Sequence, residues 1–143
     1  MDIHEEIVLN YLTKYGSATF VCPQYLFCDD KVHGGVSTKP DFLALNLEKK
    51  IVSVVEVSNS MKSDKIREMK IKIIKNKSIW PELIHRDLKR FFGKGWKFDI
   101  DIKVFIREKM IKQFNNIDKT SNPKVHILSL EYIYEKTIAE NLS

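Results

Sequence analysis

The stretch that decides the fold is residues 40–58, which read PDFLALNLEKKIVSVVEVS. It holds two apolar runs, 42–47 and 51–57, and the second is rich in the β-branched side chains that favour strands. Only the short charged connection Glu48-Lys49-Lys50 separates the runs, so the pattern predicts an antiparallel hairpin. The second run is apolar on both faces apart from Glu56, which is typical of a central strand of a sheet.

Helical and strand patterns alternate on both sides of this hairpin. Apolar spacing predicts helices over 2–15, from about 60 to 76, and over 82–92, 108–116 and 131–142. It predicts further strands over 18–22, 25–28, 96–107 and 125–130. The interleaving therefore predicts one α/β domain over residues 1–143, in which a small mixed β-sheet of four or five strands is flanked by helices.

Composition excludes several classes of protein. Apolar residues make up 43% of the 143 residues and charged residues 30%, as in an ordinary globular domain. The sequence contains no apolar run of the ~20 residues that a membrane helix needs, so we expect no membrane partner. The first residues are acidic, unlike a signal peptide, and Cys22 and Cys28 are too few for a disulfide framework. We therefore expect a cytoplasmic, reduced protein.

Positive charge is concentrated in the middle of the chain. Residues 60–97 contain twelve lysines and arginines against four acidic residues, whereas the whole chain has a net charge of +5. A basic block of this kind favours a polyanion such as nucleic acid, because phosphate neutralisation releases counterions. The alternative is a lysine-rich surface whose only role is to be solvated.

Two carboxylates lie at the outer ends of the predicted hairpin. Asp41 opens its first strand and Glu56 lies near the end of its second, so antiparallel pairing would bring them together. Paired carboxylates suit Mg²⁺, which takes one or two of them and keeps several waters. The alternatives are that Glu56 pairs with a lysine at the sheet edge and that Asp41 is a turn residue after Pro40.

The pattern Pro40-Asp41…Glu56-Val57-Ser58 resembles the motif of the PD-(D/E)XK nuclease superfamily, and the order of elements is similar over nearly the whole chain. The resemblance implies a restriction endonuclease-like core and metal-dependent cleavage of phosphodiester bonds in nucleic acid, for which we expect DNA. It implies that Asp41, Glu56 and the carbonyl of Val57 bind Mg²⁺ or Mn²⁺. Glu5 on the first helix would assist, with Glu6 as second choice. A homodimer is common for small enzymes of this type.

One position departs from the motif. Ser58 stands where the family has a lysine, and a hydroxyl cannot supply the positive charge of an ammonium. Either a lysine of the following helix replaces it, for which Lys62 and Lys65 are the candidates, or the domain has lost catalysis.

The same resemblance assigns a nucleic-acid-binding set, which comprises Lys62, Lys65, Lys70, Lys72 and His33. The lysines would contact the phosphate backbone, and His33 in the loop before Asp41 would act as a base or touch a phosphate. The alternatives are a solvated helix face and an idle loop histidine. For Trp80 and Trp96 we expect packing in the core in preference to base stacking.

Three functions remain open on the sequence. The first is a metal-dependent endonuclease with the site described above. The second is a catalytically inactive nuclease fold that binds nucleic acid, and the third is a protein-interaction module.

Overall fold

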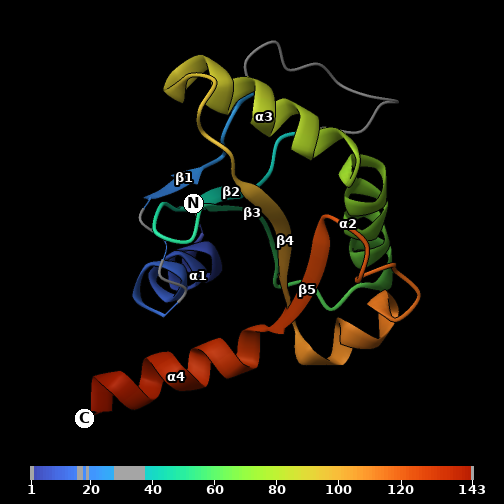
Figure 1. Ribbon diagram of the computed structural model, residues 1–143. Helices are drawn as coiled ribbons and strands as arrows, with labels where there is room; N and C mark the ends of the chain where they lie inside the picture. The colour runs from blue at the N-terminus through green and yellow to red at the C-terminus, as the bar shows by residue number, and fades with distance from the viewer. Residues whose placement is uncertain (1, 16–17, 19, 28–37, 143) are drawn as a thin grey trace.

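A mixed five-stranded sheet in the order β1-β2-β3-β4-β5 forms the centre of the molecule (Figure 1). The structure is a computed structural model that describes residues 2–15, 18, 20–27 and 38–142. Its strands are β1 (Phe20–Pro23), β2 (Phe42–Asn46), β3 (Ile51–Ser58), β4 (Asp99–Ile106) and β5 (Lys124–Ser129). The first three strands are antiparallel, whereas β3, β4 and β5 run parallel. The predicted α/β class, the hairpin and the central position of β3 are confirmed.

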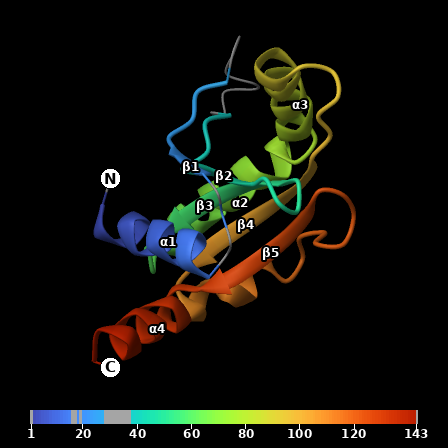
Figure 2. The same cartoon turned by 60° about the vertical axis from the view of Figure 1, so that its left-hand side comes forward.

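Helices cover both faces of the sheet. They are α1 (Ile3–Lys14), α2 (Ser63–Asn76), α3 (Ile79–Phe92), the 3-10 helix η1 (Glu108–Phe114) and α4 (Leu130–Leu142). Figures 1 and 2 show α1 and α4 on one side of the sheet, with α2, α3 and η1 on the other. Within the described part of the chain, no helix is long and apolar enough to cross a bilayer.

The alternation of side chains along the strands divides the core into two layers. Val55 of β3 and Phe105 of β4 pack with the residues of α1 and α4. Val52 and Val54 point the other way and pack with α2 and α3. Because successive strand residues face opposite sides, a central strand must be apolar on both faces. This requirement makes a buried charge on β3 conspicuous.

Helix α1 forms where the sequence predicts it, but its buried face is narrower than the apolar stripe. Asp2 caps the helix, since its Oδ1 accepts a hydrogen bond of 2.8 Å from the backbone N–H of Glu5. Val8 and Leu12 are buried, whereas Ile3 and Tyr15, at the two ends of the stripe, are 64% and 40% exposed. The sheet is thus covered by the middle of the helix alone.

Two predictions in the strands need correction. Residues 25–27 are not in a strand, because the chain leaves the sheet at Pro23, and Cys28 lies outside the described residues. Strand β4 begins at Asp99 and not at residue 96. Trp96 stays 43% exposed and stacks on Phe98 with ring centroids 5.7 Å apart, so its predicted core position is wrong.

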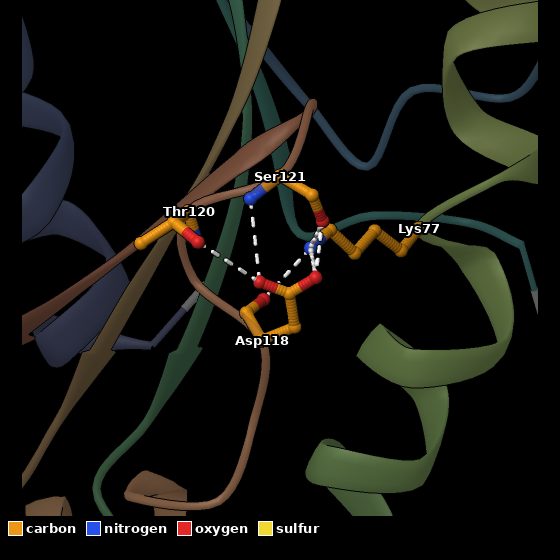
Figure 3. A network of polar contacts seen from close by, with 4 residues as sticks. All are labelled: Lys77, Asp118, Thr120 and Ser121. Atoms are coloured by element: carbon orange, nitrogen blue, oxygen red, sulfur yellow. Dashed lines mark hydrogen bonds and ion pairs between the residues drawn. The ribbon is translucent and has the colours of Figure 1, made fainter.

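Lys77 fastens the loop before β5 to the end of α2 (Figure 3). Its Nζ donates a hydrogen bond of 2.7 Å to the backbone carbonyl of Asp118. The Asp118 carboxylate accepts from the Ser121 hydroxyl and from the backbone N–H groups of Thr120 and Ser121. These hydrogen bonds, led by that of Ser121, hold the pKa of Asp118 well below its usual range. These hydrogen bonds and the contact with Lys77 hold the loop before β5 in a compact turn.

Candidate functional site

Asp41 and Glu56 lie side by side at one edge of the sheet. The register pairs Phe42 with Val55, so the next pair outward is Asp41 and Glu56. We call this the carboxyl edge, because β3, β4 and β5 all end there while β2 begins. Glu56 is only 2% exposed. Half-buried Asp41 accepts a hydrogen bond of 2.8 Å at Oδ2 from the backbone N–H of Val57.

Helix α2 supplies a cation to this pair. Lys72 Nζ lies 2.8 Å from Glu56 Oε1, and the exposed fractions of the two side chains are 20% and 3%. The same ammonium donates a hydrogen bond of 2.7 Å to the backbone carbonyl of Lys39. Glu56 Oε1 is buried, and Lys72 Nζ is the cation that lies against it in the described structure. Lys72 thus contacts both Glu56 and the segment that leads into Asp41.

Hydrogen bonds to backbone carbonyl groups also position Asp41 and the segment before it. Trp80 of α3 is fully buried and donates a hydrogen bond of 2.6 Å from Nε1 to the carbonyl of Thr38. The backbone N–H of Gln24 donates to the carbonyl of Asp41 at 2.7 Å. The predicted core position of Trp80 is therefore confirmed, and its indole helps to hold the chain entering β2.

The electrostatics of the pair are dominated by burial. Burial and, to a smaller extent, the nearby charge of Asp41 raise the pKa of Glu56, Lys72 lowers it, and the resulting pKa is about 8. A buried carboxylate next to a second carboxylate is costly to ionise, because one ammonium cannot neutralise both. The site therefore favours either a proton on Glu56 or an additional cation.

The donor chemistry fits a hard divalent cation. Asp41 and Glu56 supply carboxylate oxygens, and Glu56 Oε1 is buried without a hydrogen-bond partner in the described structure. Across the residues that the structure describes, no group of three or more His, Cys, Asp and Glu side chains has metal-site geometry. A cation here would therefore take two carboxylates, the carbonyl of Val57 and waters, a set that suits Mg²⁺.

Glu5 approaches the pair from α1, on the other face of the sheet. Partial burial raises the pKa of Glu5, and the charges of Asp41 and Asp2 raise it further. The electrostatic effect of Asp41 places Glu5 near the carboxyl edge, whereas Glu6 is exposed. The choice between Glu5 and Glu6 as an assisting residue stays a prediction.

The structure places the two lysines proposed from the sequence away from Glu56. Lys62 is exposed before α2 begins, and Lys65 is exposed with its Nζ 3.8 Å from Glu68. Lys70 of the predicted nucleic-acid-binding set donates to Asn116 in the loop after η1. His33 lies outside the described residues. Of this predicted set, Lys72 is thus the member that meets the carboxylates in the described structure.

Lys65 and Lys72 lie on nearly the same side of α2 but at different heights along the helix axis. Lys65 and Lys72 are seven residues apart, which is two helical turns, so they project from nearly the same side about 10 Å apart along the axis. The height depends on the path of residues 59–62 and on the tilt of the helix, which no periodicity encodes. The available signal was that Lys72 directly precedes buried Ile73, at the border of the apolar face.

Comparison of the chain with protein-family models, with curated proteins and with solved structures yields no match. The description of the site therefore stands on its own geometry.

Proposed function

We propose that this chain is a metal-dependent nuclease of the PD-(D/E)XK type that hydrolyses phosphodiester bonds, in DNA in the first place. One observation carries the proposal: Asp41 and buried Glu56 are adjacent at the carboxyl edge, and Lys72 contacts Glu56 at 2.8 Å. Two carboxylates and one ammonium are the groups that such a site needs, and here they converge from β2, β3 and α2.

Asp41, Glu56 and the carbonyl of Val57 would hold Mg²⁺ or Mn²⁺. When bound, such an ion polarises a phosphodiester and makes a coordinated water more acidic. The Val57 N–H bond to Asp41 Oδ2 orients that carboxylate, so its other oxygen can point toward the ion. Glu56 would be ionised in this state, because a neighbouring cation favours the charged form of a carboxyl group.

Lys72 takes the role of the lysine that Ser58 replaces. Its ammonium already lies against Glu56, so it can donate a hydrogen bond to the attacking water or to a phosphate oxygen that enters the site. Positive charge held there stabilises negative charge that develops on the phosphate. Glu5, on the opposite face, would hold a water at the same edge.

The exposed side of α2 supports a nucleic-acid substrate. Lys62 and Lys65 are exposed on the helix that supplies Lys72. Phosphate contacts of this kind carry no sequence information but orient the duplex. We therefore expect these two lysines to strengthen binding without affecting the chemical step.

The experiment is a cleavage assay with the wild type and the Glu56→Ala variant. Supercoiled, single-stranded and branched DNA and RNA are incubated with the protein in Mg²⁺ and in Mn²⁺. We expect cleavage by the wild type that the variant loses, with retained binding of the uncut substrate. Cleavage that persists in Glu56→Ala would exclude this site as its source.

The second candidate is a nucleic-acid-binding protein without catalysis. The favouring observation is that Lys72 lies 2.8 Å from Glu56, a contact that can serve a purely structural role. Salt-sensitive DNA binding, with no cleavage of any of these substrates in either metal, would favour this candidate over the nuclease.

A further inference from the structure

Arg107 lies at the carboxyl edge on the face of the sheet opposite to Glu56. It directly follows β4, whose last residue Ile106 pairs with Ser58 of β3. Glu56 faces α2, whereas Arg107 contacts Glu131 in the first turn of α4. The edge where β3 and β4 end therefore carries Asp41 and Glu56 on one face and, on the other, a guanidinium paired with Glu131.

Two elements hold the guanidinium. Its Nη1 donates a hydrogen bond of 3.2 Å to Oδ1 of Asn59, which follows β3. Its Nε lies 3.3 Å from Oε1 of Glu131, and the two side chains are 32% and 31% exposed. Glu131 is itself held, because both of its oxygens accept from the backbone N–H of Glu108 at 3.2 and 3.3 Å. The side chain of Arg107 is thus fixed before any ligand arrives.

More polar groups border the guanidinium. His4 Nδ1 lies 2.5 Å from the hydroxyl of Tyr134, which joins the start of α1 to α4. Burial raises the pKa of Tyr134, while the positive charge of Arg107 opposes that rise, so the ring lies within electrostatic reach of Arg107. Tyr134 and Arg107 thus lie on the same face of this edge, together with the carboxylates of Glu131 and Asp2.

We propose that Arg107 binds a backbone phosphate of the strand whose scissile phosphate lies at Asp41 and Glu56, an inference that rests on the proposed function. Asn59, the partner of Arg107, follows Glu56 by three residues, which is roughly 10 Å of strand. A DNA strand crossing the carboxyl edge would bring a phosphate one or two nucleotides from the scissile one within reach of this side chain. Arginine suits this contact because its planar fork binds phosphate through two parallel hydrogen bonds.

A purely structural role leaves features of this arrangement unused. An exposed ion pair contributes only about 0–1 kcal/mol to stability. Arg107 has five N–H donors, and in the described structure its polar contacts are those to Asn59 and Glu131. Nε is buried, so the donors available at the edge where the substrate would bind are those of the Nη groups that Asn59 does not occupy.

The test measures binding of a short fluorescent DNA duplex over a range of KCl concentrations, in Ca²⁺ to avoid cleavage. Three variants are compared with the wild type: Arg107→Gln, Glu131→Gln and Arg86→Gln. Glu131→Gln breaks the same ion pair but keeps the cation. Arg86→Gln removes the same charge from an exposed position on α3. Thermal unfolding of each variant separates loss of binding from loss of fold.

We expect Arg107→Gln to weaken binding about tenfold at low salt and to reduce the salt slope by about one, as for one lost phosphate contact. Glu131→Gln and Arg86→Gln should keep the wild-type slope, and Arg107→Lys should recover part of the affinity. Equal slopes for Arg107→Gln and Arg86→Gln would overturn the proposal, as would equal losses of binding in Arg107→Gln and Glu131→Gln. If the wild type binds DNA in this test but does not cleave it in Mg²⁺ or Mn²⁺, the proposed nuclease activity is contradicted and the phosphate contact of Arg107 is not. Absence of DNA binding would contradict both proposals.

Discussion

The sheet has two edges that carry charged side chains, and they differ in how those charges are buried. At the carboxyl edge Glu56 is 2% exposed and meets Lys72. At the opposite edge, which we call the amino edge because β4 and β5 begin there, a cavity of about 530 Å³ is lined by Asp101 and His126 among others. His126 Nε2 and Asp101 Oδ2 are 3.6 Å apart, and the histidine side chain is 49% exposed.

The cavity at the amino edge is therefore not where the most deeply buried of these charges lies. At the amino edge the His126 side chain is 49% exposed, whereas that of Asp101 is 19% exposed and its Oδ1 is buried without a hydrogen-bond partner among the described residues. Glu56 has lost its water, and its pKa is raised by burial. A buried charge must be neutralised by a proton, a partner or a metal, so burial of charge locates the candidate chemistry better than cavity size.

The largest expected effect comes from removing one carboxylate at each edge. Asp41→Asn keeps the shape of the side chain but removes a metal-binding charge, so we expect cleavage to fall about 100-fold or more. Asp101→Asn at the amino edge should change the rate by less than about twofold, because Asp101 lies at the opposite end of the strands from Asp41 and Glu56 and water screens its charge over that distance. Initial rates on plasmid DNA in Mg²⁺ measure both. Comparable losses in the two variants would remove the distinction between the edges.

The next effect separates two lysines on one side of α2. Lys72→Gln removes the ammonium against Glu56 and should slow cleavage about 10- to 100-fold with little change in DNA affinity. Lys65→Gln is the matched control, because it removes an equal charge two turns away. It should weaken binding slightly and leave the maximal rate unchanged. A larger loss of maximal rate in Lys65→Gln would return the catalytic role to the lysine chosen from the sequence.

The fold was largely predictable because its determinants are local. The apolar runs of β2 and β3, the short charged turn between them and the helical spacing of Val8 and Leu12 are all visible in the sequence. The adjacency of Asp41 and Glu56 followed from these features, because a hairpin fixes which residues are opposite. No long-range information was needed for either result.

The partners of these acids depend on tertiary geometry and were missed. Lys72 reaches Glu56 only because α2 packs at a particular height, and Arg107 meets Asn59 only because β4 is parallel to β3. Trp96 was placed in the core from its apolar neighbours, but β4 starts three residues later and leaves it half exposed. Periodicity indicates which face a residue occupies, not where along an element the chain meets its neighbours.

A third prediction concerns stability and pH. The unfolded chain releases the Glu56 proton near the ordinary glutamate pKa of 4.5, whereas in the folded chain the pKa of Glu56 is about 8. Between these values the folded state binds more protons, so the free energy of unfolding should decrease as pH rises, by an amount on the order of a few kcal/mol. Glu56→Gln should largely flatten this dependence, and Asp101→Asn should retain it. Urea unfolding of the three proteins between about pH 5 and about pH 9 measures the difference. A wild type that becomes more stable over this window, or a Glu56→Gln variant with unchanged pH dependence, would contradict the assignment.

The smallest effect is expected at the amino edge itself. His126→Gln removes a half-exposed partner of Asp101 at 3.6 Å, and such pairs contribute about 0–1 kcal/mol. We expect a change in melting temperature of no more than a few degrees and unchanged cleavage and DNA binding. A strong loss of DNA binding in His126→Gln would show that the cavity at this edge is functional.

The most direct test is a calorimetric titration of Mn²⁺ into the wild type, Glu56→Gln and Asp101→Asn. It asks whether the charge buried at the carboxyl edge binds a divalent cation, without requiring the correct substrate. We expect one Mn²⁺-binding site in the wild type and in Asp101→Asn, and loss of that site in Glu56→Gln. Mn²⁺ binding that survives Glu56→Gln and disappears in Asp101→Asn would move the metal to the amino edge and contradict the account.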